Sequence, residues 1–232
     1  MVQVIYSPKW FYGKDIIIDL VSIFVLVLIA FFSLRSYKVR KNKNYIYLAA
    51  SFIILAVSFL FRILTNFTVY YKVLETKDLG FITLTYQTIK TSEALFIIGF
   101  FAYRLLNLLG LYFLYSIYHK QPKSNIFLIS YLILVSTAFN KLTYHIFHLT
   151  SFILLIFITR QYLKNYYDNK SKAAKLIAFS FGIITSSEIF FGLVTVSTRF
   201  YVMAEIIQLI GYALLLCAFF MVLRHGRKKD KD

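Results

Sequence analysis

Acidic residues, proline, glycine and cysteine are all scarce in this chain, and each shortage excludes a class of protein. The 232 residues include 26 Lys and Arg but only 10 Asp and Glu, a net charge of +16. The single cysteine, Cys217, excludes an intramolecular disulfide and a cysteine-based zinc site. Both prolines lie outside the long apolar segments, which carry only scattered glycines. Transporters with broken helices need Gly and Pro interruptions at midplane, so their shortage argues against that class.

Apolar side chains dominate what is present, with 59% of residues hydrophobic, 19% aromatic and a mean hydropathy of +0.70. About 20 apolar residues cross a bilayer core of about 30 Å. We therefore predict an all-α bundle of seven transmembrane helices that forms one domain over 1–232. The predicted spans are 15–34, 45–66, 92–117, 124–140, 143–162, 173–196 and 200–223. A six-span alternative stays open, because the apolar run within 124–140 is short for a full crossing.

Successive loops are alternately rich and poor in basic residues, and this pattern predicts the orientation of the chain in the membrane. Seventeen of the 26 basic residues fall in the first, third and fifth loops and the tail, and seven fall on the opposite side. Positive charge collects in cytoplasmic loops. We expect the N-terminus outside, the C-terminus inside, and the basic loops against an anionic cytoplasmic leaflet. The region before the first span lacks a small-residue cleavage site, so that span is expected to remain as an anchor.

The one long outer loop covers about 67–91. Its stretches 67–75 and 81–88 mix β-branched or aromatic residues with polar ones, around Lys77, Asp78 and Gly80. This pattern predicts a β-hairpin that caps the outer face. An amphipathic interfacial helix is the alternative, because the periodicity fits both.

Polar residues inside the spans are the candidates for function, because ionisable groups there are costly and need a partner or a wet cavity. With the expected topology they fall in the outer half of the bilayer or near its centre, at helical spacings that share faces. We predict a polar pocket open to the outside. Its candidate ligand-binding residues are Asp19, Arg62, Arg104, Asn107, His145, His148, Glu188, Glu205 and Gln208.

Structural explanations compete with that interpretation. Arg62 is close enough to the interface to extend its charged end into water. Glu188 or Glu205 paired with Arg104 could fix helix packing only, because buried ion pairs are weak evidence for function. His145 and His148 could be interfacial hydrogen-bonding residues.

Sharper chemical roles also stay open for the same residues. His145, His148, Glu188 and Glu205 offer imidazole and carboxylate donors that suit zinc or iron, although two histidines three apart are a weak signal. No other cofactor is indicated. The histidines could also sense external pH. The planar guanidinium of Arg104 suits a carboxylate or phosphate group of a ligand.

Several functional classes lack their sequence signature. The last span has no lysine for a retinal Schiff base, and no GxSG or HExxH motif occurs, so an enzyme is disfavoured. No basic soluble domain exists to bind nucleic acid. The loops and the tail are too short to hold a kinase or cyclase.

The plan of seven spans, an outside N-terminus and a short basic tail resembles seven-helix receptors and the membrane sensor regions of bacterial histidine kinases. The stretches 51–66 and 208–223 are similar to small uncharacterised archaeal seven-helix proteins. The resemblance implies a fold plan and assigns no functional residue. We expect a receptor-like or sensory module that signals through a membrane or cytoplasmic partner. The alternatives are a small-molecule or proton-coupled transporter and a structural subunit, in each case in a microbial plasma membrane.

Overall fold

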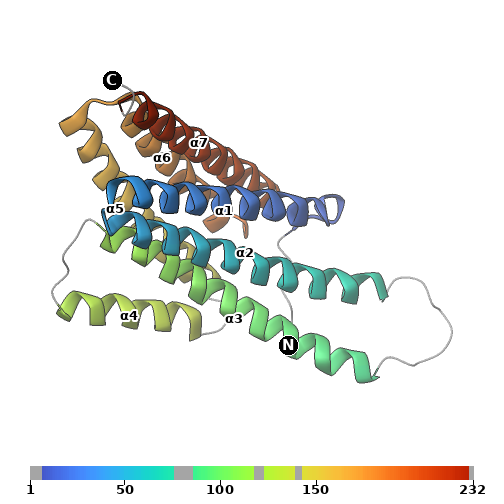
Figure 1. The fold of residues 1–232 in the computed structure, drawn as a ribbon. Helices are drawn as coiled ribbons and strands as arrows, with labels where there is room; N and C mark the ends of the chain where they lie inside the picture. Colours follow the sequence, from blue (N-terminus) through green and yellow to red (C-terminus); the bar gives the residue numbers. More distant parts are fainter. Residues whose placement is uncertain (1–6, 76–85, 118–122, 139–142, 230–232) are drawn as a thin grey trace.

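The computed structural model describes residues 7–75, 86–117, 123–138 and 143–229. Within these ranges the chain is all-α, as predicted, and no strand occurs in them. A short 3-10 turn, η1, precedes seven α-helices (Figure 1). Their bounds are η1 Lys9–Phe11, α1 Lys14–Arg40, α2 Asn44–Glu75, α3 Tyr86–Ser116, α4 Lys123–Ala138, α5 Thr143–Asn169, α6 Lys172–Gly192 and α7 Arg199–Lys229.

Six of the helices form a closed ring, in the order α1, α2, α3, α5, α6, α7 and back to α1. Helix α4 lies outside this ring, against α3 and α5 (Figure 1). We call the end of the bundle at which α1 begins the N-terminal end, and the end at which α7 finishes the C-terminal end. The ring places six helix faces around one interior, and polar side chains on those faces meet there.

Helices α3 and α5 are neighbours that run in the same direction. Tyr103 of α3 contacts Phe147 of α5, and further along both helices Tyr115 contacts Phe157. Helices α1 and α7 are also parallel, because Phe11 lies near Tyr201 and Phe32 near Phe220. A parallel pair needs a return segment between its members, and α4 supplies most of it between α3 and α5.

Helix α4 is the exception to the predicted set of full-length spans. Six helices are long and apolar enough to cross a membrane, and α4 is not among them. Its 16 residues extend about 24 Å at about 1.5 Å per residue, which is short of a core of about 30 Å. Most of its apolar side chains are exposed, and Ile133 and Thr137 are its buried ones among the described side chains. The structure thus supports a seven-helix bundle with six long candidate spans.

The predicted β-hairpin over 67–91 is wrong. Helix α2 continues to Glu75 and α3 already begins at Tyr86, while the expected turn at 76–85 lies outside the described residues. Helices α2 and α3 pack closely against each other, so each extension continues an established helix beside a helical neighbour. Such tertiary context overrides the weak strand preference of β-branched and aromatic residues. The alternative, an interfacial helix, was correct in expecting helical structure. The helical residues, however, belong to the ends of α2 and α3 and do not form a separate helix.

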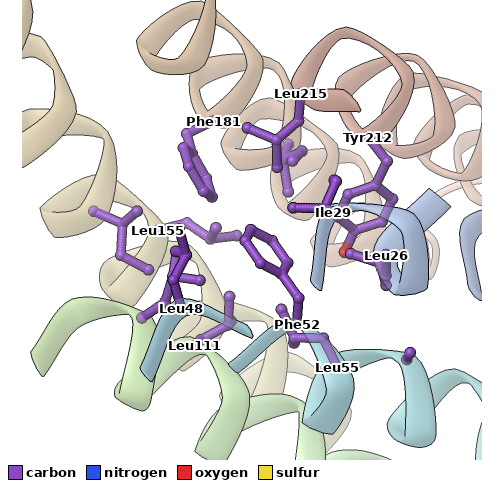
Figure 2. Packing of buried hydrophobic residues seen from close by; sticks show 14 of the residues in the cluster. Leu26, Ile29, Leu48, Phe52, Leu55, Leu111, Leu155, Phe181, Tyr212 and Leu215 are labelled. Carbon is purple, nitrogen blue, oxygen red and sulfur yellow. The ribbon is translucent and has the colours of Figure 1, made fainter. Parts of the chain in front are cut away.

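Close packing holds the ring together, because lipid tails remove the usual hydrophobic force between helices. Figure 2 shows apolar side chains from all six ring helices converging on the interior, with Leu26, Phe52 and Leu215 among them. Small residues allow the closest approaches. A Cβ added to Gly211 of α7 would lie 2.5 Å from Ile184 of α6.

The short connections at the C-terminal end have local causes. Lys41 and Lys170 adopt left-handed backbone conformations, with φ of 54° and 46°, directly after α1 and α5. Each N–H bonds back to a helix carbonyl, that of Tyr37 or Tyr166, which closes the last turn. Ser171 then caps α6 by accepting a hydrogen bond from the N–H of Ala174. These turns bring the basic segments that follow α1 and α5 to the same end of the bundle.

Candidate functional site

The guanidinium of Arg62 joins three helices at the centre of a buried polar network. Its Nη1 lies 3.3 Å from Oδ1 of Asp19 on α1, and its Nη2 contacts the carboxylate of Glu205 on α7. Nη1 also donates to Oε1 of Gln208 at 3.4 Å, and Nη2 donates to the Tyr201 hydroxyl at 3.5 Å. Arg62 is therefore held by two carboxylates and two neutral acceptors.

The spacing of residues along α7 explains how one helix supplies three of these partners. Tyr201, Glu205 and Gln208 are separated by four and three residues, so their side chains lie on one face. Asp19 and Arg62 come from α1 and α2, which are the next two helices in the ring. All five side chains are buried. This face of α7 therefore points into the ring interior.

The alternative in which Arg62 extends its charged end into water is wrong. The residue is 6% exposed, and its guanidinium carbon lies 5.5 Å from the ring centroids of both Phe59 and Phe191 and 5.7 Å from that of Tyr103. Aromatic ring faces attract a cation, most strongly where water is excluded. Two carboxylates and three rings together compensate for the loss of water around Arg62.

A second polar contact joins α5 to α6. Nδ1 of His148 lies 2.7 Å from Oε2 of Glu188, and both side chains are buried. The imidazole also stacks on the ring of Phe191, with centroids 4.9 Å apart and planes 18° from parallel. About three turns further along α5, the hydroxyls of Thr159 and Thr185 lie 3.0 Å apart. Helices α5 and α6 are therefore linked by two polar contacts.

The carboxylates expected near Arg104 contact other residues, because Glu205 reaches Arg62 and Glu188 reaches His148. The guanidinium carbon of Arg104 lies 3.9 Å from the centroid of Phe100 and 5.2 Å from that of Phe147. Arg104 is buried on α3, and aromatic faces form part of its surroundings.

The ring of Phe191 connects the Arg62 network to the His148–Glu188 pair. It stacks on His148, lies 5.5 Å from the guanidinium carbon of Arg62 and contacts Tyr201 edge-on at 5.9 Å. Phe191 follows Glu188 by three residues on α6, so both side chains lie on one face. A rotation of α6 would therefore disturb both the Arg62 network and the His148–Glu188 pair.

The remaining predicted residues are less closely connected. Asn107 is buried one turn further along α3 from Arg104. His145 is half-buried and makes an edge contact with the ring of Tyr144, and it does not share the contact with Glu188. Among the residues that the structure describes, no group of three His, Cys, Asp or Glu side chains is placed to hold a metal ion. The metal set His145, His148, Glu188 and Glu205 is thus dispersed, because Glu205 contacts Arg62 on α2 whereas Glu188 contacts His148 on α5.

Apolar residues cover the network at the N-terminal end of the bundle. A separate cluster forms there from η1, α5, α6, the α6–α7 connection and α7. Its buried members are Phe11, Tyr144, Phe191, Val194, Tyr201, Val202 and Ala204. The network side chains are buried beneath this cluster, whereas the sequence led us to expect a polar pocket open to the outside.

Sequence reasoning missed the aromatic residues that surround the charges. Phe59 precedes Arg62 by three residues, Phe191 follows Glu188 by three, and Phe100 precedes Arg104 by four. The usable signal was therefore an aromatic residue one helical turn from Arg62, Glu188 and Arg104. In a chain with 19% aromatic residues that signal was hard to distinguish from lipid-facing positions.

No protein-family model, no curated protein and no solved structure matches this sequence. The chain is an all-α, multi-pass membrane protein by its helices, and its function has to be argued from the buried site.

Proposed function

We propose that this chain is a receptor-like or sensory membrane module whose responsive element is the Arg62 network. The observation that carries the proposal is that one guanidinium joins α1, α2 and α7 through Asp19 and Glu205. A ligand that competes for any member of this set would change the relative positions of three helices. Ligands shift such equilibria only through different affinities for the two arrangements.

A small anion is the ligand class that the network suits best. The Arg62 guanidinium offers several N–H donors, and its present partners are carboxylates, which a ligand carboxylate can replace. Gln208 and Tyr201 add polar groups beside it. His148 and Glu188 would respond through Phe191, and Arg104, Asn107 and His145 would form the outer part of the same region.

The orientation belongs to the same proposal. The basic loops would lie against the anionic cytoplasmic leaflet of a microbial plasma membrane, and the N-terminal end of the bundle would face outward. Movement of α5, α6 and α7 would then reach a signalling partner through their basic cytoplasmic ends.

Thermal unfolding in nanodiscs tests the sensory role. A panel of small carboxylates should raise the melting temperature of the wild type, and the Arg62→Lys variant should lose the shift because it lacks the planar fork. Proteoliposomes should show no flux of the same compound. If alanine substitutions lower stability while the wild type binds none of the panel, the network only holds helices together.

A proton-coupled transporter is the second candidate, and the charge balance of the interior favours it. Two buried carboxyl groups, Asp19 and Glu205, share the single guanidinium of Arg62. An excess buried charge is costly in a membrane, so at least one carboxyl is expected to carry an exchangeable proton. Proteoliposome flux that Glu205→Gln or Glu188→Gln abolishes would favour this candidate over sensing.

A further inference from the structure

We propose that residues 7–13 form a hinged lid that closes the Arg62 network toward the aqueous phase at the N-terminal end of the bundle. The lid opens at Gly13 when Phe11 leaves its site against Tyr201. This inference rests on the proposed function, because the lid regulates access to the same network.

Phe11 is the closing residue. It is only 5% exposed although it precedes α1, whereas its neighbour Trp10 in the same 3-10 turn is 61% exposed. The ring of Phe11 packs edge-on against Tyr201, with centroids 6.5 Å apart. The hydroxyl of Tyr201 in turn accepts a hydrogen bond from Arg62. A single aromatic ring therefore separates Phe11 from the cation at the centre of the network.

Gly13 supplies the hinge. Its φ of +81° lies in the left-handed region, and a Cβ at this position would meet no atom within 4 Å. The conformation therefore requires glycine for backbone reasons alone. Helix α1 has its first bond directly there, since the N–H of Ile17 donates to the carbonyl of Gly13. The lid can rotate at this residue while α1 keeps its register.

One backbone hydrogen bond closes the 3-10 turn of the lid. The described backbone bond within it runs from the N–H of Phe11 to the carbonyl of Pro8, at 2.8 Å. The hydroxyl of Ser7 is buried without a hydrogen-bond partner among the described atoms. A buried unsatisfied hydroxyl opposes closure, because opening returns it to water. The apolar contact of Phe11 opposes this effect and helps to keep the lid shut.

Carboxylates lie directly beneath the lid. Asp15 is fully buried in the first turn of α1, where Oδ2 accepts from Asn66 Nδ2 at 3.5 Å, and Asp19 follows one turn deeper. Water that enters past Phe11 would reach these groups first. An open lid would thus hydrate Asp15, Asp19 and Arg62 and admit a small polar ligand.

Cysteine accessibility tests the lid without any ligand. In a Cys217→Ala background, Ser22→Cys places a near-isosteric reporter one turn beyond Asp19, and Ser33→Cys places a matched reporter at the other end of α1. Both serines are buried. The probe is a small, charged, membrane-impermeant methanethiosulfonate, and the labelling rate is followed by mass spectrometry on protein in nanodiscs.

Phe11→Ala should raise the labelling rate of the Ser22→Cys reporter about tenfold or more and leave the Ser33→Cys reporter unchanged. Val196→Ala, at an exposed position in the α6–α7 connection at the same end of the bundle, is the control and should change neither rate. Gly13→Ala should raise the first rate about 5- to 30-fold, since a left-handed alanine disfavours the closed backbone. Gly192→Ala, another glycine with open space around it, controls for the added methyl group.

Two outcomes would overturn the lid. One is an unchanged rate at the Ser22→Cys reporter in both Phe11→Ala and Gly13→Ala. The other is an equal rise at both reporters, which indicates general loosening of the bundle. Gly13→Ala keeps every lid side chain, so it serves as the deciding variant if Phe11→Ala does not fold. The proposed function fails separately, through the absence of carboxylate-dependent thermal shifts.

Discussion

Nδ1 of His148 lies 2.7 Å from Oε2 of Glu188, and this contact ties the start of α5 to the end of α6. The ring of Phe191 stacks on the same imidazole and also faces the guanidinium of Arg62. His148 therefore contacts both Glu188 and Phe191, and the ring of Phe191 in turn borders the Arg62 network. The contact is specific enough to measure.

A double-mutant cycle of His148→Phe and Glu188→Gln should give a coupling free energy of about 0.6–1.7 kcal/mol, from the average to the maximum found for hydrogen bonds between membrane helices. Phenylalanine keeps the stack on Phe191, so the cycle isolates the polar contact. The free energy of unfolding is measured by SDS titration in mixed micelles. His145→Phe is the control and should not couple to Glu188→Gln. Additive single effects would show that the contact contributes nothing.

Replacing Arg62 should be the most destabilising change in the network. Arg62→Met leaves Asp19 and Glu205 buried without their cation, which costs about 3–5 kcal/mol of unfolding free energy. Adding Asp19→Asn and Glu205→Gln removes the uncompensated charges, so the triple variant should recover much of the loss. Unfolding in mixed micelles again provides the measurement. A triple variant no more stable than Arg62→Met would contradict the ion-pair assignment.

Gly211→Ala tests the close approach of α6 and α7. The new Cβ would lie 2.5 Å from Cγ1 of Ile184 and 3.3 Å from the carbonyl oxygen of Ser180. Because the second contact is to backbone, the helices have to separate, and overpacking of this kind costs about 1–3 kcal/mol. Melting temperatures in detergent report the loss. Gly192→Ala should be neutral, and equal melting temperatures for both variants would contradict the packing.

The topology prediction concerns the two ends of the chain. We expect a C-terminal fluorescent-protein fusion to fold and fluoresce in the cytoplasm, and an N-terminal epitope tag to be accessible from outside intact cells. The basis is the charge bias of the loops together with α4 as a short return segment. Lys41 and Lys170, labelled after substitution with cysteine, should both be protected from outside. Both tags on one side would mean that α4 does not cross.

The helices were predictable because their signal is long-range and redundant. A segment of about 20 mostly apolar residues is stable in lipid as a helix. The helix satisfies all of its backbone hydrogen-bonding groups, and unsatisfied groups are costly in lipid. The extensions around Val69 and Thr88 failed for the opposite reason. Their local pattern favours strands, and only the neighbouring helix, which is invisible in a single sequence, decides their conformation.

The approximate depth of the polar residues within the spans was predictable from the sequence. The pairing of carboxylates with cations was not. Residues such as Asp19, Arg62 and Glu205 could be placed near one level from their positions within the spans. Which carboxylate meets which cation depends on helix order around the ring, and the sequence carries no direct signal for that order. Arg104 was therefore expected to take a partner that Arg62 holds, and the aromatic contacts of Phe191 remained unrecognised.

Helix α4 makes few contacts, but the parallel arrangement of α3 and α5 depends on it. Two neighbouring helices that run in the same direction require an odd number of crossings between them, and α4 provides that crossing. A chain that lost it would insert α5, α6 and α7 upside down. His148 and Glu188 would then emerge at the membrane face opposite Arg62, and no aromatic ring could bridge the two. The sidedness of the whole second half of the protein depends on one helix of 16 residues.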